Sequence, residues 1–193
     1  MDLGISKISF GDLEVSNISI GDLDITSMYF GEDVYKPNNE IKYVSTDGQI
    51  VTPYNTTGWG ANIVSNTYSD GKGIIKFNKN VEFVPDYAFR GCTTLLSITL
   101  PNTVEVIGYN SYRECRSLSS ITIPNSVTTI SDFAFNLCTI LKTIYAYPTI
   151  APSISNDTFS VINNNGVLHY PSGSNYSNWL SKLSSGWRGV ADL

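Results

Sequence analysis

Three consecutive segments decide the fold: VEFVPDYAFRGCTTLLSITLPNT (residues 81–103), VEVIGYNSYRECRSLSSITIPNS (104–126) and VTTISDFAFNLCTILKTIYAYPT (127–149). They superimpose at a period of 23 residues. A fixed period of this length is typical of a solenoid, in which each unit leaves an apolar side that only the next unit covers. The recurring positions are Val81, Val104 and Val127; Val84, Ile107 and Ile130; Phe89, Tyr112 and Phe135; Cys92, Cys115 and Cys138; Leu95, Leu118 and Leu141; and Ile98, Ile121 and Ile144.

Each segment contains a run that alternates in the manner of a β-strand: LLSITLP, LSSITIP and LKTIYAYP. Successive side chains of a strand point to opposite sides, and neighbouring strands lie about 4.8 Å apart. The polar residues are therefore expected to form two outward columns on one continuous face. We predict that this face binds a partner; the alternative is that Ser and Thr simply suit exposed strand positions. The candidate site residues are Lys76, Ser97, Thr99, Ser120, Thr122, Thr143, Tyr145 and Tyr147.

The repeats share the pattern AF-x-x-C-x-x-L-x-x-I-x-I-P-x-(S/T)-V-x-x-I. This pattern resembles the BspA-like leucine-rich repeat of bacterial surface proteins, and the match covers residues 81–147 closely. Looser similarity extends to DGQIVTPY (47–54) and to the tail from Tyr147 onward, which is similar to the family's closing segment. The resemblance implies a role in adhesion or protein recognition, without catalysis.

The N-terminal residues follow a shorter rhythm. ISFGD, LEVSN, ISIGD, LDITS and MYFGE (8–32) are five-residue units that pair into ten-residue repeats, with apolar first and third positions. They predict very short strands joined by tight turns, either as a meander or as coils of a small β-solenoid. Open strand edges favour self-assembly or docking through residues 1–35, unless the segment packs on its own chain. These repeats also resemble terminal segments of phage structural proteins.

Charge and hydropathy exclude several classes of partner. The chain of 193 residues has a net charge of -5 and only 15% charged residues, and residues 1–35 hold seven acids against Lys7. Because there is no basic stripe, we do not expect nucleic acid as a partner. No apolar run approaches the roughly 20 residues of a membrane helix. MDLGISKISFGD also lacks the pattern of a secretory signal, if Met1 is the native start.

The remaining segments are interpreted as caps. Residues 35–39 read as a linker, and Asp47-Gly48 predicts a hairpin. Residues 74–77 lie 23 residues ahead of residues 97–100 and are interpreted as the strand of an imperfect first repeat. In the tail we expect a strand at residues 167–170, a Pro-Ser-Gly turn, and a short amphipathic helix over residues 175–183 packed by Trp179 and Trp187.

The expected fold is thus a β-rich leucine-rich repeat solenoid with an N-terminal all-β segment of ten-residue repeats and a C-terminal cap with a short helix. The predicted divisions are an attachment segment and linker (1–37), an N-terminal cap with a hairpin (38–80), three leucine-rich repeats (81–149) and a C-terminal cap (150–193).

No residue pattern predicts catalysis or a cofactor. The three cysteines occupy equivalent positions and are expected to be reduced and buried rather than metal ligands or disulfides. His169, the one histidine, is expected to be structural. Glu105, Glu114 and Asp132 have no spacing that identifies a catalytic pair. The sequence therefore predicts a non-enzymatic protein without a metal site.

Two functions follow from these observations. The first is a virion-associated protein, such as a phage fibre or decoration protein, which uses its acidic N-terminal repeats for attachment or oligomerisation. The alternative is a bacterial cell-surface adhesin of the BspA type. Both expect a protein or a cell-surface glycan as the partner of the outward face. The loops that carry Trp59 and Tyr109 are expected to add contact area.

Overall fold

The computed structural model describes residues 7–10, 13–16, 28–30, 33–35 and 38–193. The chain divides into two compact units, residues 1–37 and residues 38–193. In the first unit, β1 (Lys7–Phe10) pairs antiparallel with β2 (Leu13–Ser16), and β3 (Met28–Phe30) pairs antiparallel with β4 (Asp33–Tyr35). Antiparallel pairing of neighbouring strands is what a meander predicts, whereas solenoid coils would pair in parallel. The strands expected at residues 18–20 and 23–25 lie outside the described residues.

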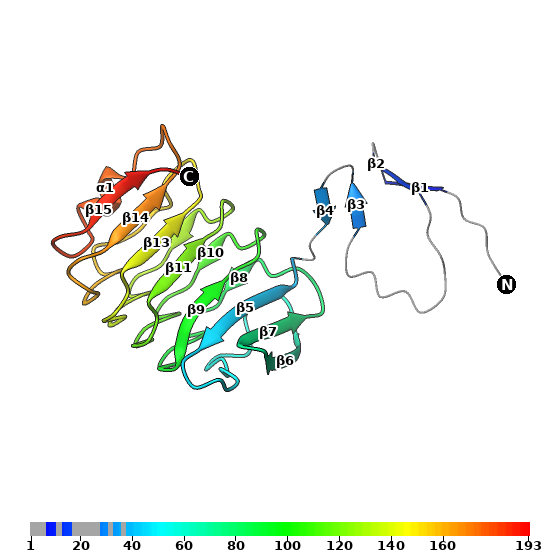
Figure 1. The fold of residues 1–193 in the computed structure, drawn as a ribbon, viewed down its shortest axis with the longest axis horizontal. Helices are drawn as coiled ribbons and strands as arrows, with labels where there is room; N and C mark the ends of the chain where they lie inside the picture. The colour runs from blue at the N-terminus through cyan, green and yellow to red at the C-terminus, as the bar shows by residue number, and fades with distance from the viewer. Residues whose placement is uncertain (1–6, 11–12, 17–27, 31–32, 36–37) are drawn as a thin grey trace. The chain divides into compact units, whose positions relative to one another are not determined.

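The second unit is a β-solenoid built on one eight-stranded sheet, with the strand order β15-β14-β13-β11-β9-β5-β7-β6 (Figure 1). Its five C-terminal strands are parallel, and the repeat period sets their register, because Ile121 pairs with both Ile98 and Ile144. The sheet consists of β5 (Glu40–Ser45), β6 (Ile63–Ser69), β7 (Lys72–Phe77), β9 (Leu95–Thr99), β11 (Ser120–Ile123), β13 (Thr143–Ala146), β14 (Val167–Tyr170) and β15 (Arg188–Ala191).

A second, three-stranded parallel sheet follows the return side of the coils. It is formed by β8 (Phe83–Val84), β10 (Val106–Ile107) and β12 (Thr129–Ile130), in the order β12-β10-β8. Between the two sheets, each coil turns through left-handed backbone conformations at equivalent positions. At one of these positions the residue is Gly91 in the first repeat, Glu114 in the second and Leu137 in the third, with φ values of 71°, 64° and 62°. The N–H groups of Gly91 and Glu114 donate to carbonyls of the next coil at 2.8 and 2.9 Å, which offsets the strain of Glu114.

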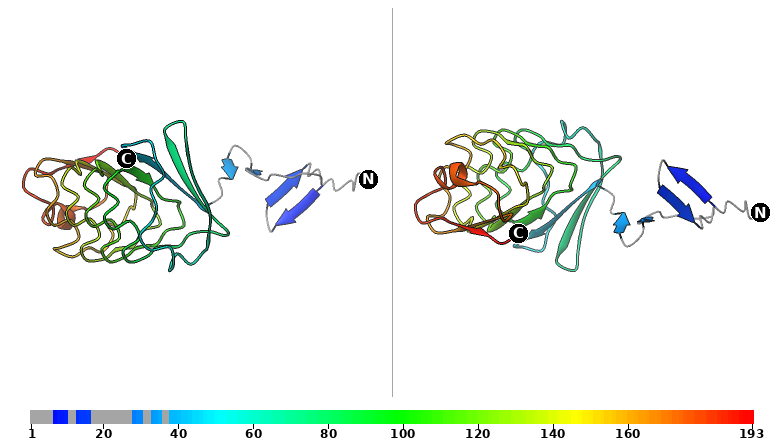
Figure 2. Two further views of the ribbon diagram at one scale, coloured as in Figure 1. Left: turned by 90° about the horizontal axis from the view of Figure 1, so that it is seen from below. Right: turned by 90° about the horizontal axis from the view of Figure 1, so that it is seen from above.

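A continuous stack of aromatic rings runs through the core from one cap to the other. Its ring centroids are 5.1–5.7 Å apart, and the three contacts between coils are nearly parallel stacks. Each such pair contributes about 0.5–1.5 kcal/mol beyond the burial of apolar area. Both views in Figure 2 show the coils stacked along one axis, with the strand cap at one end and the helical cap at the other. The stack consists of Trp59, Phe89, Tyr112, Phe135, Phe159 and Trp179.

The N-terminal cap differs from the prediction. The prediction of a hairpin at Asp47-Gly48 is wrong. The strand before this turn, β5, pairs antiparallel with β7 and with β9, and no strand follows at residues 49–54. The hairpin lies instead at Asp70-Gly71 between β6 and β7, where both residues have positive φ as a type I′ turn requires. Residues 74–77 do form a strand, but β5 separates it from β9. Trp59 is fully buried against Phe77 and adds no contact area.

The tail continues the solenoid beyond the repeats that the sequence showed clearly. Ile154, Phe159 and Leu168 follow their equivalents in the third repeat after 24 residues and are buried in the core. The strand at residues 167–170 is confirmed as β14, and β15 adds one more parallel strand. The expected helix is shorter than predicted: α1 spans only Ser177–Leu180 and has no side-chain N-cap, while its Trp179 is buried as expected.

The cysteines are free thiols. Cys115 and Cys138 are fully buried, and their Sγ atoms donate to the carbonyls of Phe89 and Tyr112 in the preceding coil at 3.0 and 3.2 Å. The prediction of a buried thiol is wrong for Cys92, which is only partly buried because the cap covers it less completely than a coil would. Burial still raises the pKa of Cys92 to about 11.

Candidate binding surfaces of the solenoid

The outward side of the eight-stranded sheet brings most of the predicted site residues together. Ser120 pairs with Ser97 and Thr143, and Thr122 pairs with Thr99 and Tyr145. Two columns of side chains therefore cross β9, β11 and β13, as the period predicted. We call this surface the strand face, and it comprises Lys42, Val44, Ser97, Thr99, Ser120, Thr122, Thr143, Tyr145 and His169.

The hydroxyl groups of the strand face make no side-chain hydrogen bonds to other residues of the solenoid (38–193). Within residues 38–193, the side chains of its five Ser and Thr residues make no hydrogen bond. Hydroxyls elsewhere on the coils do, since Thr103 donates to the carbonyl of Val81 at 2.6 Å and Ser126 to that of Val104 at 2.6 Å. The strand face thus presents unused donors and acceptors in a regular array.

The end of the strand face near the N-terminal cap is cationic. Lys42 on β5 pairs with Thr99, and with Val44 and Lys72 it lines a groove of about 330 Å³. The sequence did not identify Lys42, because only the tertiary structure places β5 beside β9. Lys76, which the sequence did propose, lies on the next strand and forms an ion pair with Glu40 at 3.3 Å.

The other end of the strand face is aromatic. The ring of His169 stacks on Tyr145 at 4.8 Å between centroids, and its Nδ1 lies 3.0 Å from both carboxylate oxygens of Asp192. This pair fixes the imidazole between β13 and the C-terminus. Tyr147 follows β13 and is 46% exposed. Sequence reasoning found the two tyrosines but not the role of His169, because its partner lies 23 residues further along the chain.

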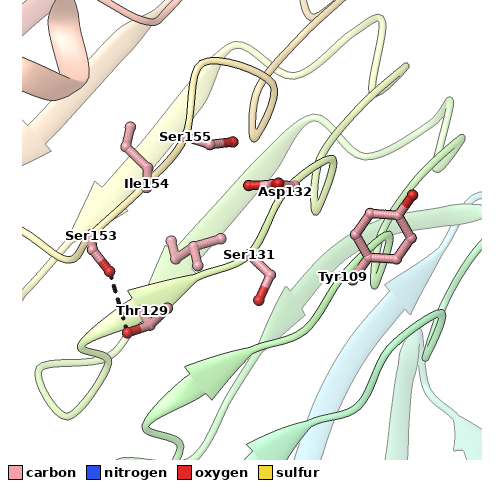
Figure 3. Close-up of a pocket in the computed structure, with 8 residues that line it drawn as sticks. Tyr109, Thr129, Ser131, Asp132, Ser153, Ile154 and Ser155 are labelled. Atoms are coloured by element: carbon pink, nitrogen blue, oxygen red, sulfur yellow. Dashed lines mark hydrogen bonds between the residues drawn. The ribbon is translucent and has the colours of Figure 1, made fainter.

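A second concave surface lies on the return side, beyond β10 and β12 (Figure 3). It has a volume of about 470 Å³, and we call it the turn-side groove. In Figure 3, Asp132 lies between Tyr109, which occupies the equivalent position of the preceding coil, and Ser155 of the following coil. The groove is lined by Tyr109, Thr129, Ile130, Ser131, Asp132, Ser153, Ile154 and Ser155.

Tyr109 is held rigidly at the border of this groove. Its ring makes edge-to-face contacts with Tyr87 at 5.5 Å and with Phe133 at 6.0 Å, and 36% of the residue stays exposed. Its backbone N–H donates to Oδ1 of Asp86 at 2.7 Å. The sequence suggested Tyr109 as a contact residue but did not reveal the groove.

Asp86 and Asp132 occupy equivalent positions but differ in what they bind. Asp86 can accept from the next coil because Gly108 stands opposite, where a Cβ atom would lie 2.6 Å from Oδ1. Ser155, which follows Ser131 after 24 residues, takes the place of Gly108 opposite Asp132, and its own N–H donates to Oγ1 of Thr158. Among residues 38–193, no hydrogen bond or ion pair is found for the Asp132 carboxylate.

Neither surface assembles a recognisable catalytic or metal centre. Among the described residues, no group of three or more His, Cys, Asp or Glu side chains could hold a metal ion. Glu105 and Asp132 lie on the return side, whereas the His169–Asp192 pair belongs to the opposite sheet. No helix in the described part of the chain is long and apolar enough to cross a membrane.

A stacked β-solenoid with an unused polar face defines a binding scaffold. A model of the BspA-type leucine-rich repeat region matches residues 61–176 in six copies, and the chain belongs to this family. Members of this family are typically non-enzymatic binding scaffolds and are typically surface-associated. The match begins after the N-terminal repeats and so gives no support to their resemblance to phage proteins. Searches of curated proteins and of solved structures gave no match.

Proposed function

We propose that the protein is an adhesin-type binding protein, exposed at a cell surface, that recognises a protein or glycan partner through the strand face. One observation carries the proposal: the five Ser and Thr side chains of this face form a regular array and make no hydrogen bond within residues 38–193. A solenoid face is the usual interaction surface of repeat proteins, since it is rigid and continuous.

The two ends of the strand face support a partner with mixed chemistry. Lys42, whose Nζ lies 4.0 Å from Oε2 of Glu40, is 61% exposed at its side chain and offers a positive charge at one end. Tyr145 and Tyr147 offer aromatic area at the other end. Tyrosine is enriched at interfaces because it supplies large contact area with little loss of conformational entropy. Candidate anchors therefore flank the central hydroxyls on both sides.

A substitution at the centre of the strand face tests the proposal. We expect Thr122→Arg to abolish binding of the full-length chain to a panel of immobilised matrix proteins and cell-surface glycans, because a bulky cation would stand in the middle of the array. The control is Thr139→Arg, which introduces the same side chain at an exposed turn outside the strand face. Equal binding by both variants would refute the proposal.

The acidic N-terminal segment remains a second element of this proposal. Seven acids against Lys7 in residues 1–35, together with short antiparallel strands, favour attachment to another copy or to a larger assembly. A virion-associated protein would need an attachment segment as well, but the family match supports a cell-surface protein better than a virion protein.

A further inference from the structure

The Asp132 carboxylate is available for a ligand because, within residues 38–193, no backbone N–H of the next coil donates to it. In the equivalent position, Asp86 accepts a 2.7 Å hydrogen bond from the next coil. Ser155 carries a Cβ atom at the position equivalent to Gly108 and prevents the same arrangement for Asp132, since a Cβ atom at Gly108 would approach Asp86 to 2.6 Å. Asp132 is exposed in the turn-side groove.

The surroundings of Asp132 combine an aromatic ring with hydroxyl groups. Tyr109 borders the groove on one side, and Ser131 adjoins the carboxylate in sequence. The groove volume of about 470 Å³ falls within the range of about 300–1,000 Å³ that is typical of small-molecule sites. Among the described residues, no Lys, Arg or His side chain lines the groove, so a negatively charged ligand would meet only repulsion from Asp132.

Two other kinds of ligand fit the groove poorly. A peptide strand cannot be added to β12, because the outer edge of this strand already pairs with Ser153 through backbone hydrogen bonds of 2.9 and 3.0 Å. A calcium ion requires six to eight oxygen ligands, and one carboxylate with scattered hydroxyls does not supply them.

We propose that the turn-side groove is a saccharide-binding site for a neutral or amino sugar. The Asp132 carboxylate accepts hydrogen bonds from sugar hydroxyls, which are strengthened by its charge. Tyr109 packs against the apolar C–H groups of the sugar ring, and Ser131 adds a hydroxyl partner. The site is separate from the strand face, so it does not depend on the function proposed above.

Ligand-observed NMR on the full-length protein tests the site. The probes are methyl α-mannoside, methyl β-galactoside, N-acetylglucosamine and glucosamine, with glucuronic acid, calcium chloride and acetyl-lysine amide as competing classes. We expect at least one of the four neutral or amino sugars to bind. Asp132→Asn and Tyr109→Leu should each weaken this binding about tenfold, as the loss of a charge-assisted hydrogen bond or an aromatic contact implies.

Matched controls separate this site from the strand face. Glu105→Gln removes an exposed acid outside the groove, and Thr122→Arg alters the strand face; both should leave sugar binding unchanged. Asp132→Asn should also unfold at the same denaturant concentration as the parent chain. The proposal is overturned if none of the four sugars binds, if Asp132→Asn binds equally well, or if only calcium or the lysine amide binds. A lowered unfolding midpoint for Asp132→Asn would likewise overturn it.

Discussion

Replacing Tyr112 by Phe should stabilise the protein. Tyr112 is fully buried in the aromatic stack, with ring centroids 5.4 Å from Phe89 and 5.1 Å from Phe135. Its hydroxyl oxygen is buried without a hydrogen-bond partner in the described structure. Phe already occupies this position in the neighbouring coils, so the substitution removes the hydroxyl and keeps the stack.

The expected gain follows from the cost of the unpaired hydroxyl. An unsatisfied buried polar group costs about 1–3 kcal/mol, whereas the stacking contacts are unchanged. We therefore expect Tyr112→Phe to raise the free energy of unfolding by about 1–2 kcal/mol. The midpoint of thermal unfolding should rise by about 2–4 °C for each kcal/mol in a domain of this size. Urea denaturation followed by tryptophan fluorescence measures the change directly.

Alkaline pH provides a second readout of the same hydroxyl. Burial, with a smaller effect from the thiols of Cys115, Cys92 and Cys138, raises the pKa of Tyr112 well above its ordinary value. Above about pH 10, the Tyr112 hydroxyl loses its proton in the unfolded chain but keeps it in the folded chain. The contribution of Tyr112 to the free energy of unfolding is therefore complete below pH 10 and falls by about 1.4 kcal/mol per pH unit above it. In Tyr112→Phe this contribution to the decline should disappear.

A second buried tyrosine serves as the control. The Tyr176 hydroxyl donates to the carbonyl of Pro148 at 2.8 Å, so Tyr176→Phe should destabilise the chain by leaving that carbonyl unpaired. The reasoning fails if Tyr112→Phe is less stable than the parent chain, or if both variants change stability in the same direction.

Further predictions concern strain, steric fit, thiol access and assembly. Glu114→Gly should stabilise by about 1 kcal/mol, because glycine adopts its φ of 64° without strain, and urea denaturation will measure this. Gly108→Ala should destabilise by more than about 1 kcal/mol in the same assay, since its Cβ would clash with Asp86. In the native protein, iodoacetamide should modify Cys92 slowly above pH 9 and leave Cys115 unmodified until unfolding. Light scattering should show a larger assembly for the full chain than for one that starts at Pro37; identical monomer masses would exclude N-terminal oligomerisation.

The repeat period made the centre of the molecule predictable. Residues 23 apart must lie side by side once the coils stack, so Ile98, Ile121 and Ile144 had to pair and the polar columns had to align. The fourth coil was less visible, because one inserted residue changed the spacing to 24 and Ile162 replaces the recurring cysteine. Its aromatic residue, Phe159, nevertheless continues the stack with Phe135 at 5.1 Å.

The caps were harder to predict because the period does not apply to them. Asp47-Gly48 and Asp70-Gly71 have the same hairpin chemistry, but only the second joins two strands. The run that contains Lys42 gains more by pairing on both sides, with β7 and with β9, than by folding back on the residues after Gly48. Covering the open end of the solenoid therefore outweighs the local preference of Asp47-Gly48 for a hairpin turn.

The sequence alone determined the solenoid, the register of its three clear repeats, most of their buried positions and the central columns of the strand face, because each of these depends on one periodic pattern. Only the tertiary structure decided which side chains are free to act. Asp86 and Asp132 are equivalent in the repeat, yet within residues 38–193 only Asp86 is hydrogen-bonded, because Gly108 faces Asp86 and Ser155 occupies the equivalent place opposite Asp132. A residue's partners in a stack depend on the next coil, and that contact exists only after folding.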